Sequence, residues 1–126
     1  MEKKEKIFDI KDRTFQFSID IVSLFRSLDT KRTENYVLGK QVLRSGTSIG
    51  SMCEEAVSGE SNADFIHKYT IALKEARETH HWLRLMVATN MITGERAKEI
   101  VQESFEIKNI LGAIVVKLKN KNKDKK

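Results

Sequence analysis

The chain has 126 residues, which suffices for one domain and makes a second independent core unlikely on size grounds. Charged residues make up 33% and hydrophobic residues 40%, with no proline and six glycines, so neither a disordered chain nor a many-stranded β fold fits this composition. Six lysines and one acid within residues 117–126 supply the whole net charge of +5, which supports a phosphate-contacting tail more than a nucleic-acid-binding body.

The first helix is predicted over about 12–28, after a charged leader at residues 1–10. Its apolar residues recur at the spacing of one helical face, and Phe15 and Ile19 are among those expected to widen the buried stripe. The polar residues 29–33 are predicted to form the first loop.

The second helix is predicted over about 34–57, with Thr33 as its N-cap. Six of the seven residues 45–51 are Gly, Ser or Thr, which cost a helix up to about 1 kcal/mol each relative to Ala. Either another helix crosses closely at this stretch, or the helix breaks at Gly46 or Gly50. We favour the close crossing, because the apolar spacing stays in phase through the stretch.

The third helix is predicted over about 62–90, with Ser61 or Asn62 as its N-cap. The fourth is predicted to begin after a cap at Thr93 and to extend to Leu118. Four amphipathic helices with short connections predict an all-α fold, an antiparallel up-down four-helix bundle that takes in the whole chain as one domain.

Glu78 and His81 have the Glu-x-x-His spacing of four-helix di-iron proteins. Such a site needs this pair on two helices, but Asp64 and His67, the other acid–histidine pair, lie on the same predicted helix. We therefore expect no metal, no cofactor and no catalytic residues. His80 is expected to be a hydrogen-bonded interior or interface histidine.

Cys53 is the single cysteine, so no intrachain disulfide can form, and a reducing, cytoplasmic location is expected. The charged N-terminal residues are not followed by a long apolar segment, which argues against a signal peptide. No apolar run approaches the roughly 18 residues of a membrane span, so no membrane partner is expected.

Two acids and two apolar residues are candidate contacts to another subunit or partner: Glu55, Glu78, Trp82 and Leu85. Glu55 lies near the end of the second helix, where the helix macrodipole disfavours acids, so it should form an ion pair within or between subunits. Its candidate partners are Arg44, Lys74 and Arg77. Trp82 and Leu85 fall off the main apolar seam, and together they would form an exposed patch for self-association.

Basic residues of the second and third helices could form a surface that binds nucleic acid. They are Lys40, Arg44, Lys68, Lys74, Arg77 and Arg84. The tail adds Lys117, Lys119, Lys121 and Lys123. Several of the helical residues have acids nearby, so much of this surface is also consistent with ordinary solvated charge.

Several motifs of the chain resemble a known protein family. They are Ser48-Ile49-Gly50-Ser51-Met52-Cys53-Glu54-Glu55-Ala56, then Ser61, Asp64-Phe65, Leu73-Lys74-Glu75-Ala76-Arg77-Glu78-Thr79 and Trp82-Leu83. Over residues 17–118, and most strongly over 41–85, the chain resembles the small four-helix-bundle proteins encoded in intervening sequences of 23S ribosomal RNA genes. Accessory variability proteins of diversity-generating retroelements belong to the same fold group.

The resemblance implies an antiparallel bundle that assembles as a ring-like homopentamer and binds nucleic acid or a nucleic-acid enzyme without catalysis of its own. Met52 stands where family members often have Asn. The leading hypothesis is a non-enzymatic, pentameric protein that engages RNA or a ribonucleoprotein through surface Lys and Arg and the lysine-rich tail. The alternative is a scaffold for an enzyme encoded nearby, such as a reverse transcriptase, without direct nucleic-acid binding.

Overall fold

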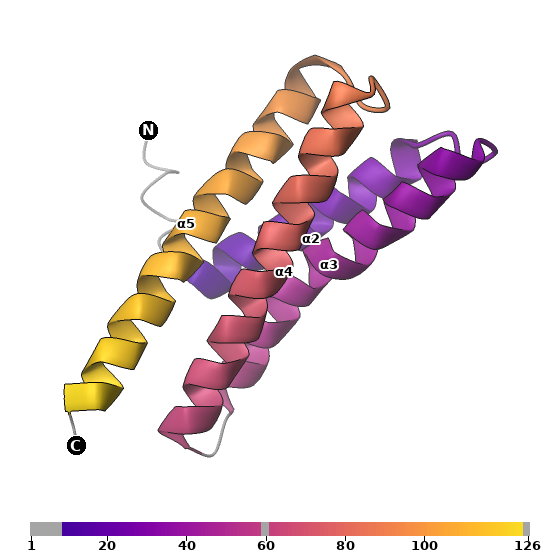
Figure 1. Cartoon of the computed structure of the whole chain (residues 1–126). Coiled ribbons are helices and arrows are strands. Elements are labelled where there is room, and N and C mark those ends of the chain that lie inside the picture. Colours follow the sequence, from indigo (N-terminus) through magenta and orange to yellow (C-terminus); the bar gives the residue numbers. More distant parts are fainter. Residues whose placement is uncertain (1–8, 59–60, 125–126) are drawn as a thin grey trace.

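The computed structural model describes residues 9–58 and 61–124 and arranges them in four helices, with no strand in these two segments. In chain order the helices are α2 (Ile10–Ser27), α3 (Thr33–Val57), α4 (Asn62–Ala88) and α5 (Gly94–Asp124). Consecutive helices run antiparallel (Figure 1). The prediction of an all-α, up-down four-helix bundle is confirmed.

The helix ends follow the predicted capping chemistry only in part. Ser61 caps α4, because its hydroxyl accepts a hydrogen bond of 3.1 Å from the backbone N–H of Asp64. The predicted cap of α3 is wrong: Thr33 is already helical, and Arg32 holds the cap position without a side-chain capping bond. Gly94, where α5 begins, has a φ of 86°, a conformation that favours glycine.

The first and last helices extend beyond their predicted limits. Helix α2 begins at Ile10, after Asp9 accepts a backbone hydrogen bond as its N-cap. The rest of the predicted leader, residues 1–8, lies outside the described residues. Helix α5 continues to Asp124, so the lysine-rich tail is helical to that point, and residues 125–126 lie outside the described part.

Helix α3 is continuous through the small residues 45–51, so the predicted close crossing is confirmed. A β-carbon on Gly46 would lie 2.9 Å from the Cγ1 atom of Ile21 in α2. One on Gly50 would lie 3.2 Å from the backbone oxygen of Thr14. Both distances are shorter than ordinary van der Waals contact, so α2 packs directly against the backbone of α3.

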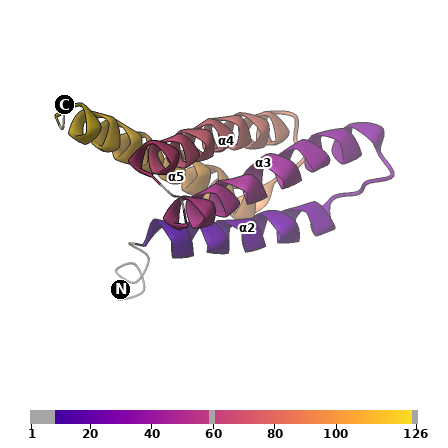
Figure 2. The same cartoon turned by 90° about the horizontal axis from the view of Figure 1, so that it is seen from below.

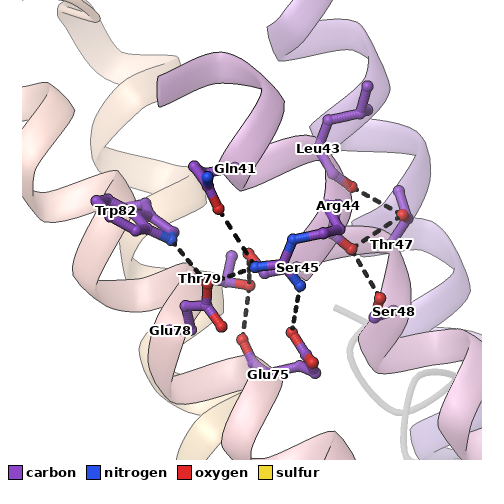
Figure 3. Close-up of polar contacts among 10 residues, drawn as sticks. All are labelled: Gln41, Leu43, Arg44, Ser45, Thr47, Ser48, Glu75, Glu78, Thr79 and Trp82. Carbon is purple, nitrogen blue, oxygen red and sulfur yellow. Dashed lines mark hydrogen bonds and ion pairs between the residues drawn. The ribbon is translucent and has the colours of Figure 1, made fainter. Parts of the chain in front are cut away.

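Another side of the same stretch contacts α4. The side chains of Ser45 and Thr79 are fully buried, and a hydrogen bond of 2.8 Å joins their hydroxyl groups (Figure 3). Ile49, Leu83 and Met86 are also fully buried and belong to the same core. The small residues of α3 therefore allow close approach of α2 and α4 at once.

Helix α2 lies at the edge of the bundle, and the α2–α3 hairpin crosses the α4–α5 hairpin at an angle (Figures 1 and 2). Its contact with α5 includes Arg13, which donates bidentate hydrogen bonds of 2.7 and 2.8 Å to Glu103. Phe15 and Ile19 are 64% and 48% exposed, so the prediction that they widen the buried stripe is wrong. An edge helix packed mainly on one neighbour buries a narrower stripe.

Candidate nucleic-acid interface

One side of α4 carries a row of exposed basic residues. They recur at intervals of three and four positions, which places them along one side of the helix over about 15 Å. The members of the row are Lys74, Arg77, His81 and Arg84. Two acids of α4, Glu75 and Glu78, lie on a different flank, where both contact Arg44 of α3.

Helix α5 separates its charges in the same way. Glu99, Glu103 and Glu106 face α2 and line the groove between α2 and α5. Four lysines lie on the flank toward α4: Lys98, Lys108, Lys119 and Lys123. The acidic flank and the basic flank are thus on different sides of one helix.

The two basic rows lie on neighbouring antiparallel helices (Figure 1). We call this surface the α4/α5 face, and it comprises Lys74, Arg77, His81, Arg84, Lys98, Lys108, Lys119 and Lys123. Among residues 9–58 and 61–124, no acid forms an ion pair with any of its lysines or arginines. Its positive charge is therefore not neutralised by ion pairs within this part of the chain.

Two grooves between α4 and α5 belong to this face. The hairpin groove, of about 570 Å³, is lined by His81, Arg84, Leu85, Val87, Ala88, Lys98, Val101 and Gln102. The tail groove, of about 420 Å³, is lined by Ala63, Ile66, His67, Thr70, Lys119, Asn122 and Lys123. Neither lining contains an acid, so each groove presents positive charge beside apolar surface.

His80 lies between the two helices of this face, as predicted for an interior histidine. Its Nδ1 atom is 2.9 Å from the Ser104 hydroxyl, and its ring centroid is 5.7 Å from that of Phe105. Burial lowers the pKa of His80 below its ordinary value, and the positive charges of Lys108 and Arg84 lower it further. The shift is consistent with a surplus of positive charge around this ring.

Arg44, one of the residues predicted to bind nucleic acid, contributes to the contact between α3 and α4 (Figure 3). Its guanidinium lies 2.5 Å from the Glu78 carboxylate and 3.5 Å from that of Glu75. The indole N–H of Trp82 donates to the same Glu78 oxygen at 3.2 Å. Two carboxylates therefore offset the charge of Arg44 locally, and Glu78 serves a contact within the chain.

Lys68 is paired in a similar way, with an acid of the neighbouring helix. Its ammonium nitrogen lies 3.1 Å from the Glu55 carboxylate, which raises the pKa of Lys68 through a hydrogen bond and charge attraction. The ion pair predicted for Glu55 thus exists, but the three partners named from sequence were wrong. Glu55 lies on α3 and Lys68 on α4, beyond the turn that joins them. The spacing of residues within one helix does not predict that these two side chains meet.

The other predicted basic residues lie in different places. Lys40 is on α3, where its nitrogen sits 5.0 Å from the ring centroid of Tyr36, apart from the α4/α5 face. Lys121 lines a smaller depression beside the N-terminus of α4, and Lys117 is exposed on α5. The structure adds two lysines, Lys98 and Lys108, that the sequence reasoning missed. A helical-wheel projection of the fourth helix would have shown that these two lysines lie on a different side of it from Glu99, Glu103 and Glu106.

The side chains of Trp82 and Leu85 lie in different environments. Trp82 is half-buried against the core and is held by Glu78, so it does not supply the exposed surface predicted for it. Leu85 is also half-buried and lines the hairpin groove. The most exposed of the large apolar residues include Phe15 and Ile19 on α2, and the hairpin groove itself contains the exposed Val87.

Within the described residues, no group of three or more His, Cys, Asp or Glu side chains is placed to hold a metal ion. No helix in the same part of the chain is both long and apolar enough to cross a membrane.

Comparison with known proteins adds to this picture. The sequence model of a family described as 23S rRNA-intervening sequence protein matches residues 6–113. A crystal structure of a protein of unknown function from the S23 ribosomal protein family of Bacteroides thetaiotaomicron is similar, at 44% identity and a TM-score of 0.78. That similarity covers 85% of this chain and 98% of the other. No curated protein matches the chain significantly.

Proposed function

The chain belongs to the 23S rRNA-intervening sequence protein family, and we propose that it is a non-enzymatic protein that binds RNA through the α4/α5 face. The observation that carries the proposal is the row of cations on two neighbouring helices, unpaired among the described residues and bordering two grooves that no acid lines. Phosphates are the ligands that such an arrangement attracts most strongly.

The face suits an extended polyanion better than a single small anion. Its cations run from Lys98 and Arg84 at the hairpin end to Lys119 and Lys123 at the other end of α4. Each phosphate contact releases counterions from the nucleic acid. With about six such contacts to single-stranded RNA, log affinity should fall against log salt with a slope of about −4.

Self-association is part of the proposal, in the form of the homopentamer that the resemblance implies. We assign this contact to α2 and α3, because each of these helices leaves large apolar side chains exposed that another copy could cover. They are Phe15, Ile19, Tyr36 and Val37. If copies meet through α2 and α3, each leaves its α4/α5 face free, and several faces on one particle raise the overall affinity for one RNA.

The competing function is a scaffold for a nucleic-acid enzyme such as a reverse transcriptase, without RNA binding of its own. The exposed Phe15 and Ile19 favour it, since they offer an apolar contact on an edge helix. Light scattering distinguishes the two uses of this surface: a stable oligomer covers it with other copies, and a monomer leaves it for a different protein.

The test of RNA binding is a salt titration with a structured RNA, followed by fluorescence anisotropy between about 50 and 200 mM salt. The full chain should bind with a steep slope. Removal of residues 119–126 takes away five lysines, of which Lys119 and Lys123 belong to the α4/α5 face, and should lower the magnitude of the slope by about 1 to 3. Absence of binding at low salt contradicts the proposal. Binding that ignores both salt and the truncation contradicts it as well.

A further inference from the structure

We infer that the hairpin groove binds an unpaired nucleobase together with its phosphate, so that the preferred RNA is a loop or single strand and not a continuous duplex. This inference rests on the proposed function, because it specifies which kind of RNA the α4/α5 face selects. It is drawn from the groove's combination of an apolar floor and a cationic rim.

The apolar part of the groove's lining, which we call its floor, comes from both helices. Leu85 and Ala88 lie one turn apart on α4, and Val101 lies opposite them on α5. Val87 adds a side chain that is 36% exposed. A purely electrostatic site for phosphates needs no such floor. A flat aromatic base that leaves water gains from covering it.

The rim carries the charges that a nucleotide would meet. Arg84 and Lys98 stand on opposite helices, with His81 and Gln102 beside them. Arg84 can donate two parallel hydrogen bonds to one phosphate, and Gln102 can donate to and accept from the edge of a base. The volume of about 570 Å³ falls within the roughly 300–1,000 Å³ of sites for small ligands.

An aromatic side chain follows the groove's lining residues along α5. Phe105 follows Val101 by four residues, one turn further along the helix, and is 41% exposed. The ammonium nitrogen of Lys108 lies 4.9 Å from the centroid of this ring. An exposed ring beside a cation is a common platform for a second base and its phosphate in single-strand binding proteins.

A duplex cannot use these features. Its bases are stacked and paired inside the helix, and the wide shallow groove of A-form RNA presents hydroxyls and base edges. It would contact the cations of the face and leave the apolar floor uncovered. Bases in loops and single strands can be splayed out and inserted between side chains.

An acidic peptide with an aromatic side chain shares part of this chemistry. The extent of the positive surface favours RNA, because the cations continue beyond the hairpin groove to Lys119 and Lys123. A regular series of phosphates can follow that length. A short peptide would engage one groove.

The test compares three RNAs of equal phosphate number with the full chain at low salt: a hairpin with a large loop, a single strand and a blunt duplex. The double variant Leu85→Gln/Val101→Thr makes the floor polar and keeps every charge. We expect the intact protein to bind the looped and single-stranded RNAs about five- to tenfold more tightly than the duplex. The double variant should lose that preference and bind the duplex within about twofold of the intact protein.

Equal binding of all three RNAs, unaffected by the double variant, would overturn the inference and leave the proposed function standing. Binding of none of them would overturn the proposed function. A polyglutamate peptide containing tyrosine, if it binds as tightly as the looped RNA and is equally weakened by the double variant, would also overturn the inference.

A second measurement does not depend on how the double variant folds. Loop RNA that contains 4-thiouridine is crosslinked to the unaltered chain, and the crosslinked peptides are identified by mass spectrometry. We expect crosslinks from loop positions to the segments 81–88 and 98–108, and weaker crosslinks from stem positions. Crosslinks confined to α2 and α3 would overturn the inference.

Discussion

Helices α3 and α5 both carry glycine within the helix and basic residues on the surface, but they use them differently. In α3, a β-carbon on Gly50 would meet the backbone of α2 at 3.2 Å, and Arg44 is engaged by acids. In α5, a β-carbon on Gly112 would meet only the end of Leu73, at 4.0 Å, and Lys98 has no ion pair among the described residues. Helix α3 is committed to packing, whereas α5 keeps a surface for a ligand.

The difference shows why the number of basic residues predicts a nucleic-acid surface poorly. Arg44 and Arg84 are both exposed arginines of the central helices. A phosphate that binds Arg84 would displace water, because no described acid forms an ion pair with this residue. A phosphate that binds Arg44 would have to displace a carboxylate. The position of a cation relative to the acids of the neighbouring helix decides its availability.

The largest expected effect concerns the packing of α3. Gly50→Val should destabilise the fold by about 3 kcal/mol or more, because its branched side chain would press against the backbone of α2 at Thr14. Urea unfolding followed by circular dichroism measures this loss. The matched control is Gly112→Ala, which meets little and should gain up to about 1 kcal/mol from better helix propensity. Similar losses for the two variants would abolish the contrast between the helices.

A smaller effect is expected at the buried hydrogen bond between α3 and α4. Thr79→Val removes the hydroxyl partner of Ser45 in a fully buried setting and should cost about 1–3 kcal/mol in urea unfolding. Adding Ser45→Ala should recover part of that loss, because no polar group is then left without a partner. A double variant as unstable as the sum of both single variants would show that the bond contributes little.

Breaking the ion pair of Arg44 should have less effect still. Glu78→Gln is expected to lower stability by under about 1 kcal/mol, because the pair is partly exposed to solvent and Glu75 still lies near Arg44. RNA binding should stay within about twofold of the intact protein, since Arg44 lies between α3 and α4 and outside the α4/α5 face. A large gain in RNA affinity would mean that the α3 side of α4 also binds phosphates.

The smallest effect is a pH dependence from His80. Its pKa is lower in the folded chain than in the unfolded chain, so the unfolded chain binds more protons and stability falls as the pH drops below about 6.5. His80→Gln should reduce that drop in urea unfolding between pH 7.5 and 5.5. The control variant, His67→Gln, leaves His80 intact and should show the same fall in stability as the unaltered protein. Equal drops in all three proteins would contradict the assignment.

Much of the fold could be predicted from the sequence, because helical periodicity and capping are local properties. The continuous α3 also followed from apolar spacing that stays in phase through the small residues. The exposure of Phe15 and Ile19 could not be predicted, since it depends on α2 lying at the edge of the bundle. Periodicity shows which side of a helix is apolar but not how many neighbours cover it.

The candidate site was predictable only in part. Lys74, Arg77 and Arg84 were named from sequence and lie on the α4/α5 face, but so were Arg44 and Lys68, which are paired. Pairing across helices depends on their rotation and relative height, which the spacing within one helix does not determine. Lys98 and Lys108 could not be assigned to the face from the sequence for the same reason. Only the packing of α5 on α4 places them beside the other cations.

The most direct test of the α4/α5 face compares two variants that lose the same charge. Arg77→Gln/Arg84→Gln/Lys98→Gln removes cations from the face, and Arg26→Gln/Lys31→Gln/Lys40→Gln removes cations from α2, the first loop and α3. Binding of a structured RNA is measured by fluorescence anisotropy at about 50 mM salt. We expect the first variant to lose about tenfold to a hundredfold in affinity and the second to stay within about threefold of the intact protein. Equal losses would show that RNA responds only to net charge and would contradict the account.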